Sequence, residues 1–119
     1  MPVRSLRSPV LKWPDRVAVE QALREWAAEE SARHPELVRL GYFGSYARGD
    51  WGVGSDLDVV AVVKHSELPF HARGAQWAVE RLPVSTDLLV YTEREWDELR
   101  QGGSRFATTL ANETVWVAP

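Results

Sequence analysis

Cysteine is absent from the 119-residue chain, and this excludes both a disulfide framework and a thiolate metal site. Long apolar runs are also absent, because none approaches the roughly 20 residues that a bilayer-spanning helix needs. The N-terminal sequence MPVRSLRSPVLKW lacks the apolar core of a secretion signal. We therefore expect a cytoplasmic protein in a reducing compartment, with no membrane partner.

An excess of positive charge is missing as well. The chain holds 14 basic and 17 acidic residues, a net charge of −3, whereas a dedicated nucleic-acid-binding protein usually has a strong basic excess. We therefore expect no strong binding to nucleic acid. The locally basic residues 1–13 are predicted to form a flexible tail. Residues 14–119 are predicted to form a single domain, because a chain of this length supports one core.

Apolar periodicity predicts the order of the helices and strands. Helices are predicted over residues 14–33, 71–82 and 92–100, with a further helical turn over 106–110. Strands are predicted over residues 37–43, 57–63 and 84–91, with a last strand or tail over 114–117. The sequence T-E-R-E at 92–95 has the form of a capping box. This order predicts an α/β (α+β) fold in which helices flank a small mixed β-sheet.

Two aspartates, Asp56 and Asp58, mark the start of the predicted strand 57–63. Residues two apart on a strand point to the same face, so their Cα atoms should lie about 7 Å apart on that face. Two such anions at the edge of an apolar core repel each other, and a divalent cation with oxygen ligands would compensate them. An isolated D-x-D, however, is more often a pair of exposed residues at a strand start.

A third aspartate, Asp87, lies inside the predicted strand 84–91. Aspartate is depleted in strands, so a charge at this position needs a reason. If this strand pairs beside residues 57–63, Asp87 joins the face that carries Asp56 and Asp58. Three carboxylates on one face form a candidate site for two Mg²⁺ ions, which support in-line displacement at phosphorus.

A glycine-rich stretch precedes these aspartates. Gly44 and Ser45 follow a predicted strand, and residues 45–48 could begin a short helix. Such a turn presents backbone N–H groups to an anion, and Ser45 adds a hydroxyl donor for a phosphate oxygen. Arg48 is either a further phosphate ligand or part of a surface salt bridge.

Other phosphate and metal motifs do not fit this stretch. Asp50 stands where a P-loop requires lysine, and neither an EF-hand loop nor a G-x-G-x-x-G dinucleotide turn is present. The three histidines have no spacing that supports a serine-hydrolase triad.

The pattern Gly44-Ser45, then Asp56-x-Asp58, then Asp87 resembles the minimal nucleotidyltransferases of the DNA polymerase β-like nucleotidyltransferase superfamily. The resemblance implies the nucleotidyltransferase fold. It also implies that Asp56, Asp58 and Asp87 bind two Mg²⁺ ions and are catalytic, and that Asp87 helps to activate the attacking hydroxyl. The residues expected to bind nucleotide, with ATP as donor, are Gly44, Ser45 and Arg48.

Stand-alone members of this family resemble antitoxins that are paired with a helical toxin of the HEPN type. The resemblance therefore implies transfer of AMP to a toxin hydroxyl, that of a tyrosine, and a partner or self-association that supplies the acceptor. Two alternatives remain open: an antitoxin that acts by complex formation alone, and nucleotidyl transfer to a small molecule or an RNA end. Trp51 is interpreted as a base-stacking residue, a partner contact or a cap on its own loop.

Overall fold

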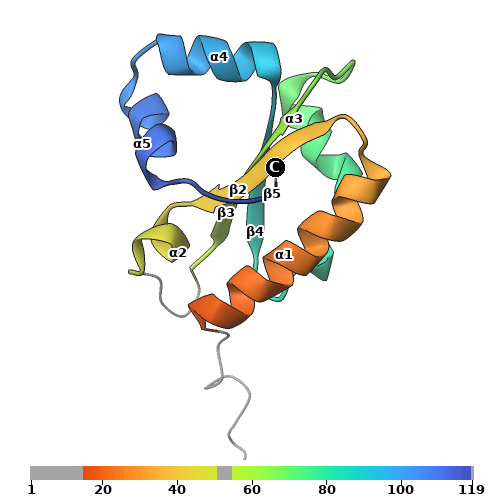
Figure 1. Ribbon diagram of the computed structural model, residues 1–119, viewed down its shortest axis with the longest axis vertical. Coiled ribbons are helices and arrows are strands. Elements are labelled where there is room, and N and C mark those ends of the chain that lie inside the picture. The colour runs from red at the N-terminus through yellow and green to blue at the C-terminus, as the bar shows by residue number, and fades with distance from the viewer. Residues whose placement is uncertain (1–14, 51–54, 119) are drawn as a thin grey trace, which may run out of the picture.

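The computed structural model describes residues 15–50 and 55–118 (Figure 1). Its centre is a four-stranded sheet in the order β4-β3-β2-β5. Strand β2 pairs antiparallel with β3 and β5, whereas β3 and β4 are parallel. The mixed sheet predicted from the sequence is thereby confirmed. The strands are β2 (Leu37–Phe43), β3 (Leu57–Val63), β4 (Thr86–Thr92) and β5 (Val115–Ala118).

Strand β3 lies inside the sheet and is buried on both faces. Leu57, Val59 and Ala61 belong to the core that faces helix α1 (Arg16–Arg33), while Val60 and Val62 belong to the core on the opposite face. Such a strand needs apolar residues at successive positions, which explains the run of β-branched residues in its sequence. Asp58 interrupts that run at the N-terminal end of the strand.

Helices α4 (Glu93–Gln101) and α5 (Arg105–Glu113) pack on the face opposite α1 (Figure 1). The predicted capping box of α4 is present, because the Thr92 side chain accepts from the Glu95 backbone while the Glu95 side chain accepts from the Thr92 backbone. Helix α5 is longer than the single turn predicted from the sequence. Its buried residues Ala107 and Leu110 hold it against the sheet.

The helix predicted over residues 71–82 is wrong. The structure has the four-residue helix α3 (Phe70–Arg73) and two short 3-10 turns, η2 (Gly74–Gln76) and η3 (Val79–Arg81).

Tertiary contacts at residues 77 and 78 explain this break. The ring of Trp77 is buried and stacks on His34 at a centroid distance of 3.9 Å. The backbone of Ala78 donates to Glu30 Oε1 and accepts from Trp26 Nε1. These bonds to α1 use backbone groups that a continuous helix would need for itself.

Some expectations fall on other parts of the chain. The predicted tail over residues 1–13 and the interpretation of Trp51 lie outside the described residues. Helix α1 begins at Arg16 and has Asp15 as its N-cap, close to the start predicted from the sequence. Among the helices that the structure describes, none is both long and apolar enough to cross a membrane.

Candidate active site

The predicted carboxylates come together at the N-terminal ends of the parallel strands β3 and β4. Asp58 and Asp87 are direct partners in the parallel register of β3 and β4. Partners in register point to the same face on neighbouring strands, which are about 4.8 Å apart. Asp56 precedes Asp58 by two residues and is exposed to solvent, as is Asp87. The pairing on which the three-carboxylate prediction depended is therefore present.

The electrostatic coupling of these groups is visible in the pKa of Asp58. Its pKa is raised above the ordinary value, first because the carboxyl is partly removed from water, and then because Asp87 and Asp56 repel its charge. The positive charge of Arg48 acts in the opposite direction. The Asp58 carboxyl therefore lies close enough to Asp87 and Asp56 for their charges to act on it.

Gly44 brings the end of β2 against this group. Phe43 is the register partner of Asp58, so the turn that follows β2 begins beside the aspartate. Gly44 has φ of 78°, and a Cβ atom at this position would lie 2.4 Å from Asp58 Oδ2. Both the backbone conformation and the close approach therefore require glycine.

The short helix α2 (Ser45–Arg48) follows at once, as the sequence predicted. Gly44 is its N-cap and provides no side chain to cap the first amides. The backbone N–H of Arg48 donates to Gly44 O, and that of Gly49 donates to Ser45 O. The structure thus brings Gly44 next to Asp58 and places Ser45 in the following helical turn.

Arg48 forms two ion pairs in the structure. Its Nε lies 3.1 Å from Asp50 Oδ2, and its Nη1 lies 3.2 Å from Glu113 Oε1 at the end of α5. The salt bridge that the sequence left as one alternative is therefore present. Glu113 was not predicted, because it stands 65 residues away and no local pattern points to it.

Comparison with known families agrees with this geometry. Residues 19–117 match the family described as "Nucleotidyltransferase domain". The chain belongs to the nucleotidyltransferase domain family. No curated protein matches the chain.

Solved structures show the same fold. A crystal structure of a proposed nucleotidyltransferase from Sulfolobus solfataricus has a TM-score of 0.62 and 22% identity, and the match covers 92% of this chain and 86% of that chain. A crystal structure of a toxin–antitoxin with AMP-PNP has a TM-score of 0.56 and 21% identity, with 82% of this chain and 71% of that chain covered. These similarities support the nucleotidyltransferase fold.

The carboxylates of this nucleotidyltransferase domain have the chemistry that Mg²⁺ requires. Magnesium is usually held by one or two carboxylates, with substrate phosphates and water completing its coordination. Across residues 15–50 and 55–118, no three His, Asp or Glu side chains form a ready-made metal site. The register pair Asp58 and Asp87 nevertheless supplies oxygen ligands on one face, and Asp56 lies close enough to act on the Asp58 charge.

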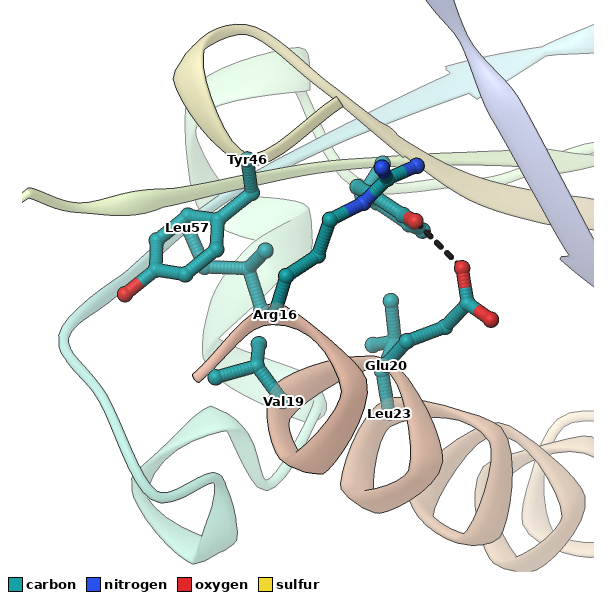
Figure 2. Close-up of a pocket in the computed structure, with 7 residues that line it drawn as sticks. Arg16, Val19, Glu20, Leu23, Tyr46 and Leu57 are labelled. Carbon is teal, nitrogen blue, oxygen red and sulfur yellow. Dashed lines mark hydrogen bonds between the residues drawn. The ribbon is translucent and has the colours of Figure 1, made fainter. Parts of the chain in front are cut away.

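A hollow on the other face of the sheet does not form part of this site. Figure 2 shows Arg16, Val19, Glu20 and Leu23 of α1 facing Tyr46 and Leu57. The hollow leaves no room for a water molecule. Tyr42 also lines this hollow; its hydroxyl donates to Glu20, and this bond holds the pKa of Glu20 below its usual value. We interpret this face as structural support for the nucleotidyltransferase site.

Proposed function

We propose that this protein is a magnesium-dependent nucleotidyltransferase that transfers AMP from ATP to a hydroxyl of a partner protein. The partner proposed is a helical toxin of the HEPN type, the acceptor is a tyrosine, and the transfer neutralises the toxin. The protein would then act as an antitoxin.

One observation carries the catalytic part of this proposal. Asp58 and Asp87 are register partners on one sheet face, and Gly44 lies against the Asp58 carboxylate. The first backbone turn after β2 is thereby brought next to the carboxylates. A triphosphate bound at the amides of that turn would have its α-phosphate beside the metal-binding edge.

Each residue has a distinct proposed role. Gly44 and Ser45 bind the β- and γ-phosphates through backbone N–H groups and the Ser45 hydroxyl. Asp56 and Asp58 hold Mg²⁺, which supplies charge neutralisation on the triphosphate when it is bound. Asp87 also binds metal and orients the acceptor hydroxyl.

The proposed reaction is an in-line substitution at the α-phosphorus. The acceptor oxygen forms a bond to that phosphorus, the bond to the bridging oxygen of the β-phosphate breaks, and pyrophosphate leaves with that electron pair. The proton of the acceptor hydroxyl passes to the Asp87 carboxylate or to solvent. Positioning and charge neutralisation account for the rate increase, which suits a site made of carboxylates and backbone amides.

One observation supports the choice of nucleotide and partner. A similar fold occurs in a toxin–antitoxin structure with AMP-PNP, an ATP analogue.

The test is co-expression with the protein encoded by the neighbouring gene, followed by intact-mass measurement of both chains. We expect the partner to gain the mass of one or more AMP units, and peptide mapping should locate them on tyrosine. Asp87→Asn should abolish the gain. Glu98→Gln removes an exposed carboxylate on α4 and should leave it intact. An unmodified partner beside the wild-type protein would refute the proposal.

A second candidate function is neutralisation by complex formation alone. It is favoured by the similar fold in a toxin–antitoxin structure, because a partner protein can also be neutralised by binding without any transfer. Under this function, Asp58→Asn would still protect cells from the partner. Loss of protection by a variant that still copurifies with the partner would exclude it.

A further inference from the structure

Helix α5 contacts the candidate site along one stripe. Phe106, Leu110 and Glu113 follow the spacing i, i+4, i+7 and therefore lie on one side of the helix. The ring of Phe106 meets Phe43 edge-on at a centroid distance of 6.1 Å, and Leu110 is buried in the same core. Glu113 then reaches Arg48 of α2. The stripe thus contacts the chain both before and after the Gly44-Ser45 turn.

Helix α2 has little means of holding its own position. It has four residues, and an isolated helix of that length is unstable in water. Tyr46 anchors it on one side, because its side chain is fully buried in the core beneath α1. On the other side, the pair between Arg48 and Glu113 joins α2 to a longer helix that is packed on the sheet.

We infer that Glu113 is a positioning residue for nucleotide binding, because it fixes the Arg48 guanidinium and, through it, the phosphate-binding turn. The inference rests on the proposed function and deepens it. It assigns a role to the last residue of α5, which lies far from the glycine-serine and aspartate motifs in sequence. The ligand concerned is the triphosphate of a nucleotide.

The geometry of the guanidinium explains how this works. Asp50 accepts from Nε and Glu113 accepts from Nη1, so two bonds set the plane of the group. The bonds to Asp50 and Glu113 use Nε and Nη1, and the inference assigns Nη2 to a phosphate oxygen. A planar guanidinium fixed in this way loses less freedom when it binds a phosphate oxygen.

Glu113 would have the opposite effect if it merely competed with the triphosphate for Arg48. Removing its charge would then tighten nucleotide binding, since one competing anion would be gone. If Glu113 positions Arg48, the same substitution weakens binding. The sign of the change therefore separates the two roles.

The first measurement is a calorimetric titration of the protein with the Mg²⁺ complex of α,β-methylene-ATP, an analogue that does not react. It gives the Kd for the nucleotide. We expect Glu113→Gln to weaken binding about fivefold, as for loss of one oriented charge contact. In an Arg48→Ala background the same substitution should change the Kd less than about twofold, because its effect passes through Arg48. Tighter binding in Glu113→Gln, or an equal loss in both backgrounds, would overturn the inference.

Glu98→Gln is the matched control. It makes the same change of charge on an exposed glutamate, but its pair with Arg94 lies within α4. We expect its Kd to equal that of the wild type.

A second measurement does not need nucleotide. The N–H groups of Arg48 and Gly49 bond within the α2 turn, so their hydrogen exchange reports how firmly that turn is held. We expect Glu113→Gln to speed their exchange severalfold and Glu98→Gln to leave it unchanged. Unchanged exchange in Glu113→Gln would overturn the inference. If the wild type bound no nucleotide, the proposed function would fail, and the exchange result alone would decide whether Glu113 positions the turn.

Discussion

Asp58 of β3 and Asp87 of β4 are register partners near the N-terminal ends of two parallel strands. The turn that follows β2 begins beside them, because Phe43, the last residue of β2, also pairs with Asp58. Like charges opposite each other on neighbouring strands destabilise a sheet. Here the partial burial of Asp58 and the charges of Asp87 and Asp56 raise its pKa. The fold therefore brings like charges together at this end of the β3–β4 pair, which is unfavourable in the absence of a cation.

The first prediction concerns the stability of the metal-free protein. Since the pKa of Asp58 is raised in the folded state, the folded chain binds its proton more tightly than the unfolded chain, and the charged form at neutral pH costs stability. Asp58→Asn should raise the Tm at pH 7 by roughly 2–6 °C, the size expected for an effect below 1 kcal/mol. Scanning calorimetry in EDTA measures this.

The same variant should respond differently to Mg²⁺. Magnesium should raise the Tm of the wild type and have a smaller effect on Asp58→Asn, because one ligand is lost. A lower Tm for Asp58→Asn in EDTA would contradict the repulsion on which this prediction depends. The stabilisation by Asp58→Asn should also fade as the pH falls, when Asp58 in the wild type becomes protonated.

The second prediction separates two reasons for glycine after β2. Gly44→Ala meets both a positive φ and a Cβ position 2.4 Å from Asp58 Oδ2, so it should destabilise the fold by about 2 kcal/mol or more and abolish nucleotide binding. Gly49→Ala meets a positive φ of 84° but no atom within 4 Å. Gly49→Ala should lower the free energy of unfolding by only about 1 kcal/mol and leave nucleotide binding nearly intact. Urea unfolding and nucleotide titration test both variants.

Equal losses in Gly44→Ala and Gly49→Ala would mean that backbone conformation alone decides the effect. The close approach of Gly44 to the Asp58 carboxylate would then have no functional consequence.

The third prediction divides binding from transfer. Asp87 lies at the exposed start of β4, whereas Gly44 and Ser45 belong to the turn proposed for the phosphates. Asp87→Asn should therefore keep the Kd for Mg²⁺ and α,β-methylene-ATP within about threefold, yet lower AMP transfer by 100-fold or more, on the order expected for loss of an acid–base or metal-orienting group. Titration and partner mass measure the two effects. Transfer at the wild-type rate by this variant would contradict the role of Asp87.

The fourth prediction concerns acid stability. Arg73 is buried and donates to the carbonyls of Leu68 and Val90 and to both carboxylate oxygens of Glu95. The bonds from Arg73, with those from Thr92, lower the pKa of Glu95 to about 2. This pair links the crossover between β3 and β4 to the start of α4.

The direction of the change in stability with pH follows from the lowered pKa of Glu95. Its stabilising contribution is complete above the unfolded value near 4.5 and is lost as the pH falls toward about 2. Because Glu95 is partly exposed, we expect Glu95→Gln to destabilise the protein by only about 1 kcal/mol at pH 7. The difference from the wild type should shrink between pH 4.5 and 2, as measured by urea unfolding. Glu98→Gln, which removes an exposed pair with Arg94, should show no such dependence.

The local motifs were predictable from the sequence because each depends on neighbouring residues. The two-residue period of a strand predicts that Asp56 and Asp58 share a face, and in the structure Asp58 lies in β3 while Asp56 directly precedes the strand. Thr92 and Glu95 cap a helix through contacts three residues apart. Likewise, the apolar run of β3 indicates a strand buried on both faces, and the structure confirms it.

Other features depend on contacts that no local pattern encodes. The helix predicted over 71–82 does not form, because Ala78 bonds to Glu30 and Trp26, 48 and 52 residues away along the chain. The Arg48 partner Glu113 is 65 residues distant. Energies of this kind outweigh intrinsic helix propensity, which is only a few tenths of a kcal/mol per residue.

The sequence alone therefore determined the types of chemistry this protein carries: a glycine-serine turn, a D-x-D strand start and a third aspartate in a strand. Only the tertiary structure decided that Asp87 stands in register with Asp58 and that Gly44 lies against the Asp58 carboxylate. It also decided that α5 contacts α2 through the ion pair of Glu113 with Arg48. The physical reason is that strand pairing and helix docking are set by burial and hydrogen bonding summed over the whole fold. A residue's neighbours in sequence contribute only part of that sum.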